Sequence, residues 1–202
     1  MTPSISLKTL PGEAVILENE TARLEPLRLE HISALKDVAF DKTNWEYSPG
    51  GITDSVRLAQ YVARALRDKL SGLAYPFVIY DKRSGEIAGS TRYGNISAHD
   101  NRLEIGWTWM ATKFRGSGLN KACKFELLRF AFETMKVNRV EFKTDLNNAR
   151  SRRAIEKIGA GQEGILRQHM KLDNGKWRDT VYYSILNQEW SKIKEEIFSE
   201  FL

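Results

Sequence analysis

The 202-residue chain has little of what marks secreted and membrane proteins. It contains one cysteine, Cys123, so no intrachain disulfide can form. No stretch is long and apolar enough to cross a membrane, and residues 1–20 lack the basic start, apolar run and cleavage site of a secretory signal. We therefore expect a cytoplasmic protein with no membrane partner. Because Cys123 lies in an apolar helical stripe, we expect its thiol to be buried and not reactive.

The phosphate-binding signatures of the common nucleotide folds are also missing. There is no Gly-Lys-Ser/Thr sequence for a P-loop, and the Gly-x-Gly of residues 116–118 is followed by Lys121 where a dinucleotide fold requires glycine or alanine. Repeats, low-complexity segments and linkers are absent, and 42% hydrophobic residues suffice for one core. We predict a single domain over residues 1–202 and no metal site.

The charge balance leaves several kinds of partner open. A net charge of +5 is compatible with nucleic acid, with a polyphosphate ligand or with no charged partner. An RNA-binding protein would use Tyr93, Trp107 and Tyr182 to stack on bases, but the chain has no aromatic-basic motif of a recognised form. We therefore expect no nucleic-acid partner.

The most informative feature that is present is the turn at residues 115–121. It follows a strand-like run at residues 103–110 and opens a helical segment that ends near Met135. The free N–H groups of such a turn point the same way, the helix dipole adds positive potential, and two glycines allow a phosphate to approach closely. Taken alone, the turn fits a nucleotide, a coenzyme or ordinary turn chemistry.

The hydrophobic pattern predicts alternating strands and helices along the whole chain. Strands are expected at residues 14–17, 22–27, 75–80, 86–92, 103–110, 138–144, 164–171 and 176–186, and helices at residues 29–39, 53–72, 119–135, 154–158 and 189–201. The helix after the turn is expected to be amphipathic, with Lys121, Lys124 and Arg129 off its apolar face. A strand-helix-strand-helix order from residue 103 onward implies one parallel pair in a mostly antiparallel sheet.

Four short motifs, in this order, resemble the GCN5-related N-acetyltransferase (GNAT) family, and within it the ribosomal-protein N-terminal acetyltransferases. They are Leu-Glu-Ile-Gly-Trp at 103–107, Arg-Gly-Ser-Gly at 115–118, Asn-Ala-Arg-Ser at 148–151 and Lys-Ile-Gly-Ala at 157–160. The family signature around the turn is Arg/Gln-x-x-Gly-x-Gly/Ala, and this chain departs from it at the first position, which is Lys113. The resemblance implies an α+β protein with α/β/α layers, in which the strands holding Trp107 and Phe142 splay apart to admit acetyl-CoA.

The resemblance implies that the turn at residues 115–121 binds the coenzyme. Backbone N–H groups of Arg115, Gly116, Ser117, Gly118, Leu119 and Asn120 would hold the pyrophosphate, with the charges of Arg115 and Lys121 nearby. Backbone groups of Trp109, Met110 and Ala111 would pair with the pantetheine amides or polarise the thioester. Asn148 resembles the asparagine that bonds to the pantetheine arm, or else it is a helix cap.

The reaction implied is the transfer of an acetyl group to a primary amine. Glu104 is the candidate general base, and a cross-strand carboxylate is its structural alternative. Ser151 resembles the serine proposed to protonate the departing thiolate, although a serine at a helix start also bonds to backbone. His169, in the last hairpin, is a second candidate base, because imidazole is a common general base in enzymes.

The acceptor side is weakly specified. Trp45, Tyr47, Trp107 and His169 are the candidate wall of an acceptor pocket, although aromatic residues at strand and loop positions more often fill cores. The basic cluster of Arg150, Arg152 and Arg153 would meet the 3′-phosphate of the coenzyme or face solvent. The resemblance implies that the acceptor is a protein N-terminus or a small-molecule amine, and that the protein forms a homodimer, as related enzymes often do. A module that binds acyl-CoA without catalysis remains the alternative function.

Overall fold

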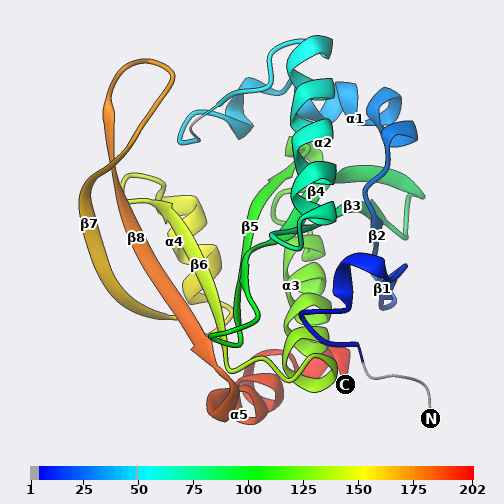
Figure 1. Ribbon diagram of the computed structural model, residues 1–202, viewed down its shortest axis with the longest axis vertical. Helices are drawn as coiled ribbons and strands as arrows, with labels where there is room; N and C mark the ends of the chain where they lie inside the picture. The colour runs from blue at the N-terminus through cyan, green and yellow to red at the C-terminus, as the bar shows by residue number, and fades with distance from the viewer. Residues whose placement is uncertain (1–4, 49) are drawn as a thin grey trace.

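One twisted sheet runs through the computed structural model, which describes residues 5–48 and 50–202 (Figure 1). Its strands are β1 (Leu17–Glu18), β2 (Ala22–Pro26), β3 (Tyr75–Asp81), β4 (Glu86–Ser97), β5 (Arg102–Met110), β6 (Arg139–Asp145), β7 (Gly161–Lys171) and β8 (Trp177–Leu186). They lie in the order β1-β2-β3-β4-β5-β6-β8-β7, and among them only β5 and β6 are parallel neighbours. This mixed sheet confirms the predicted fold class.

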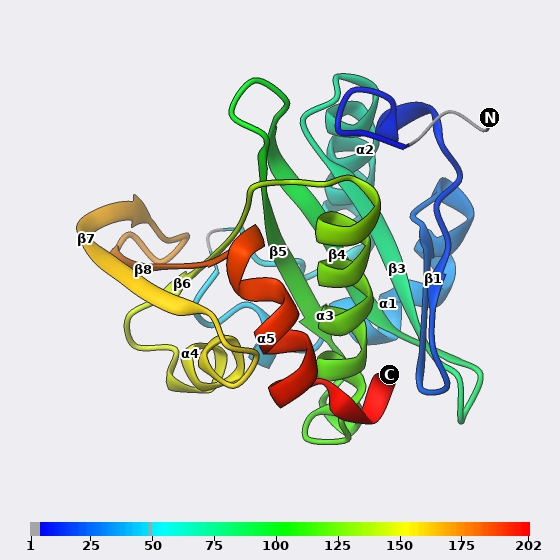
Figure 2. The ribbon, with the colours of Figure 1, turned by 90° about the horizontal axis from the view of Figure 1, so that it is seen from below.

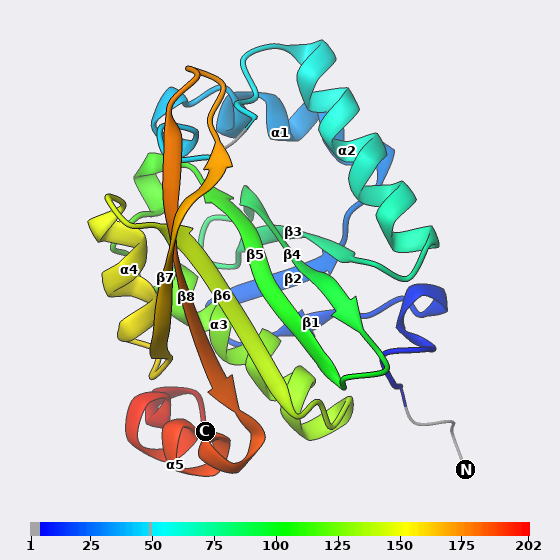
Figure 3. The same ribbon diagram turned by 60° about the vertical axis from the view of Figure 1, so that its left-hand side comes forward.

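Helices cover both faces of the sheet, as Figure 3 shows. They are α1 (Ile32–Ala39), α2 (Ser55–Leu70), α3 (Leu119–Arg129), α4 (Ala149–Glu156) and α5 (Asn187–Ile197). The start of α2 follows from its cap, because the Asp54 carboxylate accepts the N–H groups of Val56 and Arg57, each at 2.9 Å. No helix of the described residues is long and apolar enough to span a membrane.

Two hydrophobic cores follow from the alternation of side chains along the central strands. Phe77 and Tyr93 point into the larger core against α3, whereas Val78 and Trp109 point into the smaller core under α1 and α2. Tyr93 is fully buried and its hydroxyl donates to the Leu127 carbonyl at 2.6 Å. The RNA-binding alternative required Tyr93 to stack on a base, and its burial prevents this.

Helix α3 is buried more completely than its sequence suggests. The C-terminal segment packs on the side of α3 that faces away from the sheet (Figure 2), where Phe125 contacts Trp190, Phe198 and Phe201. Cys123 is 1% exposed, and burial raises the pKa of its thiol to about 12, as expected for an unreactive cysteine. Lys124 was predicted to lie off the apolar face of this helix, yet its side chain is only 6% exposed.

The parallel pair opens into a gap, as predicted. Residues Arg102 to Glu104 pair with Arg139 to Glu141, and beyond these three positions β5 and β6 have no register partners in each other (Figure 1). A bulge adds to the divergence, because Trp107, at φ +50°, is the extra residue where the β4–β5 register shifts. The gap therefore begins at Glu104 and widens toward the carboxyl ends of both strands.

Candidate active site

Two helix N-termini meet at the wide end of the gap. The chain leaves β5, makes the glycine turn and enters α3, and it leaves β6 and enters α4 through the cap residue Asn148 (Figure 3). Ligands of α/β sheets bind beyond the carboxyl ends of parallel strands, where successive helices begin. The topology thus places the candidate site at this end of the sheet.

The glycine turn presents free donors to open space. Gly116 and Gly118 have φ of +77° and +87°, and a Cβ added at either would meet nothing within 4 Å. Among the described residues, no hydrogen-bond acceptor is found for the backbone N–H groups of Gly116, Gly118, Asn120 or Lys121. Converging donors at an unfilled helix start suit a diphosphate, so these residues fit the coenzyme.

Not every N–H group of the turn is available. Arg115 donates its backbone N–H to the Thr112 carbonyl at 3.0 Å, which removes it from the predicted set. Ser117 and Leu119 make long bonds of 3.4 Å to the Phe114 carbonyl and to the Ser117 hydroxyl. The donor set is therefore narrower than the run predicted from the sequence.

Positive side chains flank the turn. The Arg115 guanidinium donates to Asn44 Oδ1 at 2.7 Å, and burial together with the charge of Arg150 lowers the pKa of Arg115. Lys121 Nζ lies 2.5 Å from a Glu200 carboxylate oxygen. The predicted basic cluster of Arg150, Arg152 and Arg153 is divided. The charge of Arg150 acts on Arg115 at the turn, whereas Arg152 donates to the Tyr183 hydroxyl of β8 at 3.1 Å.

The open edge of β5 supplies fewer groups than expected. Ala111 donates its N–H to the Ala88 carbonyl at 2.9 Å and its carbonyl accepts from Phe114 at 3.0 Å, so its backbone is already bonded. Because peptide groups alternate between the two edges of a strand, those of Met110 face the gap. The side chain of Trp109 is 4% exposed and donates to the Tyr61 hydroxyl at 3.1 Å in the smaller core.

The start of α4 carries two polar groups with spare hydrogen-bonding capacity. Asn148 Oδ1 accepts the Ser151 N–H at 3.0 Å, which is the capping role that the sequence left open. In the described part of the chain, the Ser151 hydroxyl and Asn148 Nδ2 have no hydrogen-bond partner. Both remain able to bond to a ligand at the mouth of the gap.

Glu104 lies where the gap begins. It is 6% exposed, and its Oε2 accepts from Asn95 Nδ2 at 2.6 Å and pairs with Lys143 Nζ at 2.9 Å. Burial lowers the pKa of Lys143, but attraction to Glu104 outweighs it and leaves that pKa above its ordinary value. Glu104 is thus a carboxylate held by two side chains in one orientation.

A chain of contacts leads from Glu104 to His169. Lys143 Nζ lies 4.7 Å from the centre of the Tyr182 ring, and the His169 ring meets Tyr182 edge-on at 5.8 Å between centroids. His169 Nδ1 is 3.1 Å from Thr180 Oγ1. The structure therefore brings both candidate bases to one polar face, with Lys143 and Tyr182 between them.

The aromatic residues predicted to wall the acceptor pocket have different roles. Trp107 is 43% exposed and covers Arg92, whose guanidinium is 5.1 Å from the Trp107 ring and 4.8 Å from the Tyr61 ring. Trp45 instead belongs to the smaller core, because its indole donates to the Ala39 carbonyl at 2.7 Å and its ring packs on Trp109. Trp45 is therefore mainly a packing residue, which is the alternative that the sequence left open.

The loop before α2 reaches across to the tip of the last hairpin (Figure 3). The Asp173 carboxylate accepts the N–H groups of Gly50 and Gly51 at 3.1 and 3.2 Å, and Arg57 reaches it at 3.4 Å. Behind this contact, Arg178 donates to the Tyr47 carbonyl at 3.1 Å. Tyr47 and His169 thus belong to two segments that are joined beside the gap.

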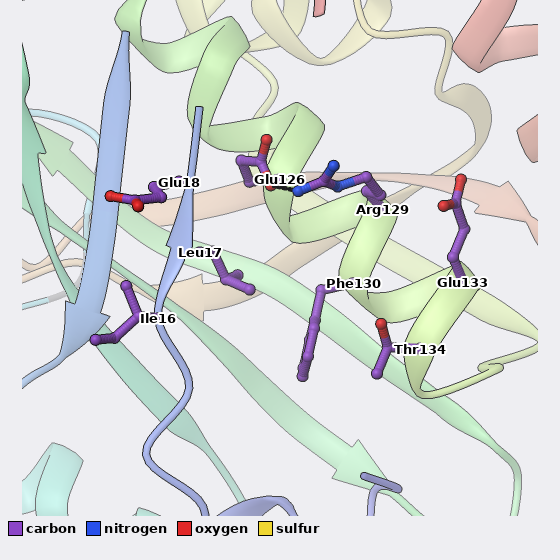
Figure 4. A pocket seen from close by; sticks show the side chains of 8 residues that line it. All are labelled: Ile16, Leu17, Glu18, Glu126, Arg129, Phe130, Glu133 and Thr134. Atoms are coloured by element: carbon purple, nitrogen blue, oxygen red, sulfur yellow. Dashed lines mark hydrogen bonds and ion pairs between the residues drawn. The ribbon is translucent and has the colours of Figure 1, made fainter. Parts of the chain in front are cut away.

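A hollow on another part of the surface is lined by several acidic side chains (Figure 4). It lies between β1 and the end of α3, and Ile16, Leu17, Glu18, Glu126, Arg129, Phe130, Glu133 and Thr134 line it. Phe130 is twelve residues beyond Gly118, which is about 18 Å along a helix. This acidic hollow is therefore remote from the glycine turn and its free donors.

Sequence reasoning missed several polar residues of the site. Asn95, Lys143 and Tyr182 hold or adjoin the candidate bases, and Lys124 reaches Thr108 from beneath the sheet. One signal was available, because Glu141 and Lys143 alternate with Val140 and Phe142 in the predicted strand and so share one face. The sequence thus predicts which residues share this polar face of β6, but it does not predict that Glu104 of β5 lies beside them.

Comparisons with known proteins agree with this geometry. Residues 22–161 match the model of the Acetyltransferase (GNAT) domain. The chain is 35% identical over 113 residues to a Bacillus subtilis protein named Putative ribosomal N-acetyltransferase YdaF, in a match that spans 56% of this chain and 59% of that protein. The chain thus covers less than two thirds of that relative's length.

Solved structures extend the likeness to almost the whole fold. A putative acetyltransferase from T. thermophilus shares 32% identity and a TM-score of 0.82, with 93% of this chain and 97% of that chain covered. Mycobacterium smegmatis RimJ, solved in complex with CoA-disulfide, has a TM-score of 0.77 at 21% identity, covering 93% and 94% of the two chains. The chain belongs to the GNAT family of N-acetyltransferases.

Proposed function

We propose that this protein transfers an acetyl group from acetyl-CoA to a primary amine by direct attack within a ternary complex. One observation carries the proposal: the gap between β5 and β6 has free N–H donors of the glycine turn at its wide end and the carboxylate of Glu104 at its narrow end. Acetyl-CoA supplies an activated acetyl thioester. The chain supplies binding, orientation and proton transfer.

Each part of the site has a distinct task. The N–H groups of Gly116, Gly118, Asn120 and Lys121 bind the diphosphate, and the Met110 backbone orients the arm that enters the gap. Glu104 takes the proton that the acceptor amine releases, directly or through a water molecule. Its bonds to Asn95 and Lys143 keep the carboxylate aimed in one direction.

The acceptor class follows from proton energetics and from likeness. A lysine side chain must lose a proton at a cost of about 4.6 kcal/mol at pH 7, against about 1.4 kcal/mol for an α-amine. The relative YdaF carries a name that refers to ribosomal acetylation. We therefore infer that a protein N-terminus is the preferred acceptor, and that a small-molecule amine is the second candidate.

The proposal is tested by the release of free thiol. Purified protein is incubated with acetyl-CoA and a panel of peptide N-termini, lysine-containing peptides blocked at the N-terminus, polyamines and amino acids. We expect acceptor-dependent thiol release, fastest with an unblocked peptide. Rates equal to those in buffer across the panel, together with tight coenzyme binding by calorimetry, would favour the non-catalytic acyl-CoA-binding module.

Ser151→Ala tests the role of the serine at the start of α4. If the Ser151 hydroxyl donates to the departing sulfur, we expect kcat to fall by about 10-fold, because a thiol of pKa near 8.5 gains modestly from a proton donor. The affinity for CoA should change little. A fall in affinity with kcat unchanged would instead assign Ser151 to coenzyme binding.

A further inference from the structure

Beneath the open edge of β5, a lysine is buried without an acidic partner. Lys124, in the second turn of α3, is 6% exposed, and its Nζ donates to Thr108 Oγ1 at 3.0 Å. Within the described residues, Lys124 forms no ion pair, and Cys123 is the one titratable group whose field acts on it. A buried cation without a counter-charge is costly to a fold and calls for a reason.

Thr108 connects this lysine to the gap. It lies on the part of β5 that has no partner in β6, directly after the bulged residue Trp107, and its side chain is exposed. Its hydroxyl is also 2.7 Å from the hydroxyl of Thr91, which is buried on β4. Thr108 is thus the point where a buried network reaches the surface of the gap.

The number of hydrogen-bond donors and acceptors around Thr108 determines where its hydroxyl hydrogen can point. A threonine oxygen has two lone pairs and one hydrogen. Both hydroxyls also make long contacts with the Gly106 carbonyl, Thr91 Oγ1 at 3.3 Å and Thr108 Oγ1 at 3.5 Å. When Lys124 and Thr91 both donate to Thr108, both lone pairs are used, and its hydrogen can turn from this carbonyl to a partner in the gap. An ammonium group behind the hydroxyl strengthens that donation, because charge-assisted bonds polarise the groups next to them.

We propose that the Thr108 hydroxyl, backed by the Lys124 ammonium, donates a hydrogen bond to the carbonyl oxygen of the acyl thioester and stabilises the negative charge that develops there. This inference rests on the proposed function. Thr108 touches the reacting carbonyl, and Lys124 acts through it as a positioning residue. No proton is transferred, since the pair supplies only electrostatic stabilisation.

The stabilisation by Thr108 and Lys124 depends on pH, because it requires Lys124 to be charged. Burial lowers the pKa of Lys124 to about 8, while the neighbouring Cys123 thiol, with its pKa raised to about 12, stays neutral. Thr91 from β4 and Thr108 from β5 face Lys124 with uncharged hydroxyls. The stabilisation is therefore present while Lys124 is charged and is lost as the pH rises through about 8.

The decisive experiment is a double-mutant cycle measured on kcat. Thr108→Val and Lys124→Met are each expected to lower kcat by about 10²-fold, in the range found when one donor to a developing oxyanion is removed. Because the two groups form one unit, the double variant should lose no more than Thr108→Val alone. Lys124→Arg, which stays charged, should retain activity above pH 8.5 where the wild type declines.

Controls separate this inference from a structural role and from the proposed function. Lys124→Met should unfold at no lower temperature than the wild type, because it removes a buried cation and keeps the apolar stem. Lys192→Met, at an exposed position on α5, should match the wild type in kcat. An inactive wild type would overturn the proposed function, whereas an active wild type with unaltered Lys124→Met kinetics, or with multiplicative losses in the double variant, would overturn this inference.

Discussion

Gly118→Glu is expected to abolish coenzyme A binding while the protein stays folded. The φ of Gly118 is +87°, which costs an L-residue about 1 kcal/mol or more, and a Cβ there meets no other atom within 4 Å. The new carboxylate would project where the free N–H groups converge and would repel a diphosphate. We expect the affinity measured by calorimetry to fall by more than about 100-fold, a loss above roughly 2.8 kcal/mol.

Gly85→Glu is the matched control for this substitution. Gly85 has a φ of +71°, has no atom within 4 Å of an added Cβ and lies in the turn between β3 and β4. The charge change and the backbone strain are therefore equivalent. Gly85→Glu should bind coenzyme A as the wild type does, with a similar loss of thermal stability. Equal affinity in the Gly118 and Gly85 variants would reject the glycine turn as the diphosphate site.

The second large effect is expected at Glu104. A glutamine in its place keeps the size of the side chain and cannot accept a proton from the amine. We expect kcat/KM for a peptide N-terminus to fall by about 10²–10⁴-fold, the usual contribution of a general base. Coenzyme affinity should be unchanged.

Glu141→Gln provides the comparison for this loss. Glu141 lies in register with Glu104 across β5 and β6, and its Oε2 is 3.7 Å from the same Lys143 ammonium. The variant removes one negative charge from the same polar face without touching the proposed base. It should retain most of the activity. If both variants lose activity equally, the polar face acts as a whole, and if Glu104→Gln stays active, His169 is the base to test next.

The local elements were predictable because their signals are local. The apolar alternation of residues 103–110, the Asp54 cap of α2 and the glycine turn each depend on residues close in sequence. The parallel pair of β5 and β6 also followed from the order of elements along the chain. The resemblance of the motifs to the GNAT family, confirmed by the match over residues 22–161, also predicted that β5 and β6 splay apart.

The misjudged side chains are those whose environment is set by distant segments. The sequence placed Lys124 off the apolar face of an amphipathic helix, but in the fold α3 packs under β5, where Thr108 accepts from the Lys124 ammonium. For Trp45 the sequence left open a pocket wall or a core position, and only α2 and β5 provide Tyr61 and Trp109 as its packing partners. No local periodicity reports such contacts, because they join residues more than fifteen positions apart.

The sequence by itself determined the elements, the position of the anion-binding turn and the family. Periodicity and turn chemistry act over a few residues, so the chain carries these features directly. Only the tertiary structure decided which donors of the turn are free, how Asn95 and Lys143 hold Glu104, and that Lys124 is buried behind Thr108. These properties depend on strand register and helix packing, which bring together groups from separate strands and helices and set how much water each one keeps.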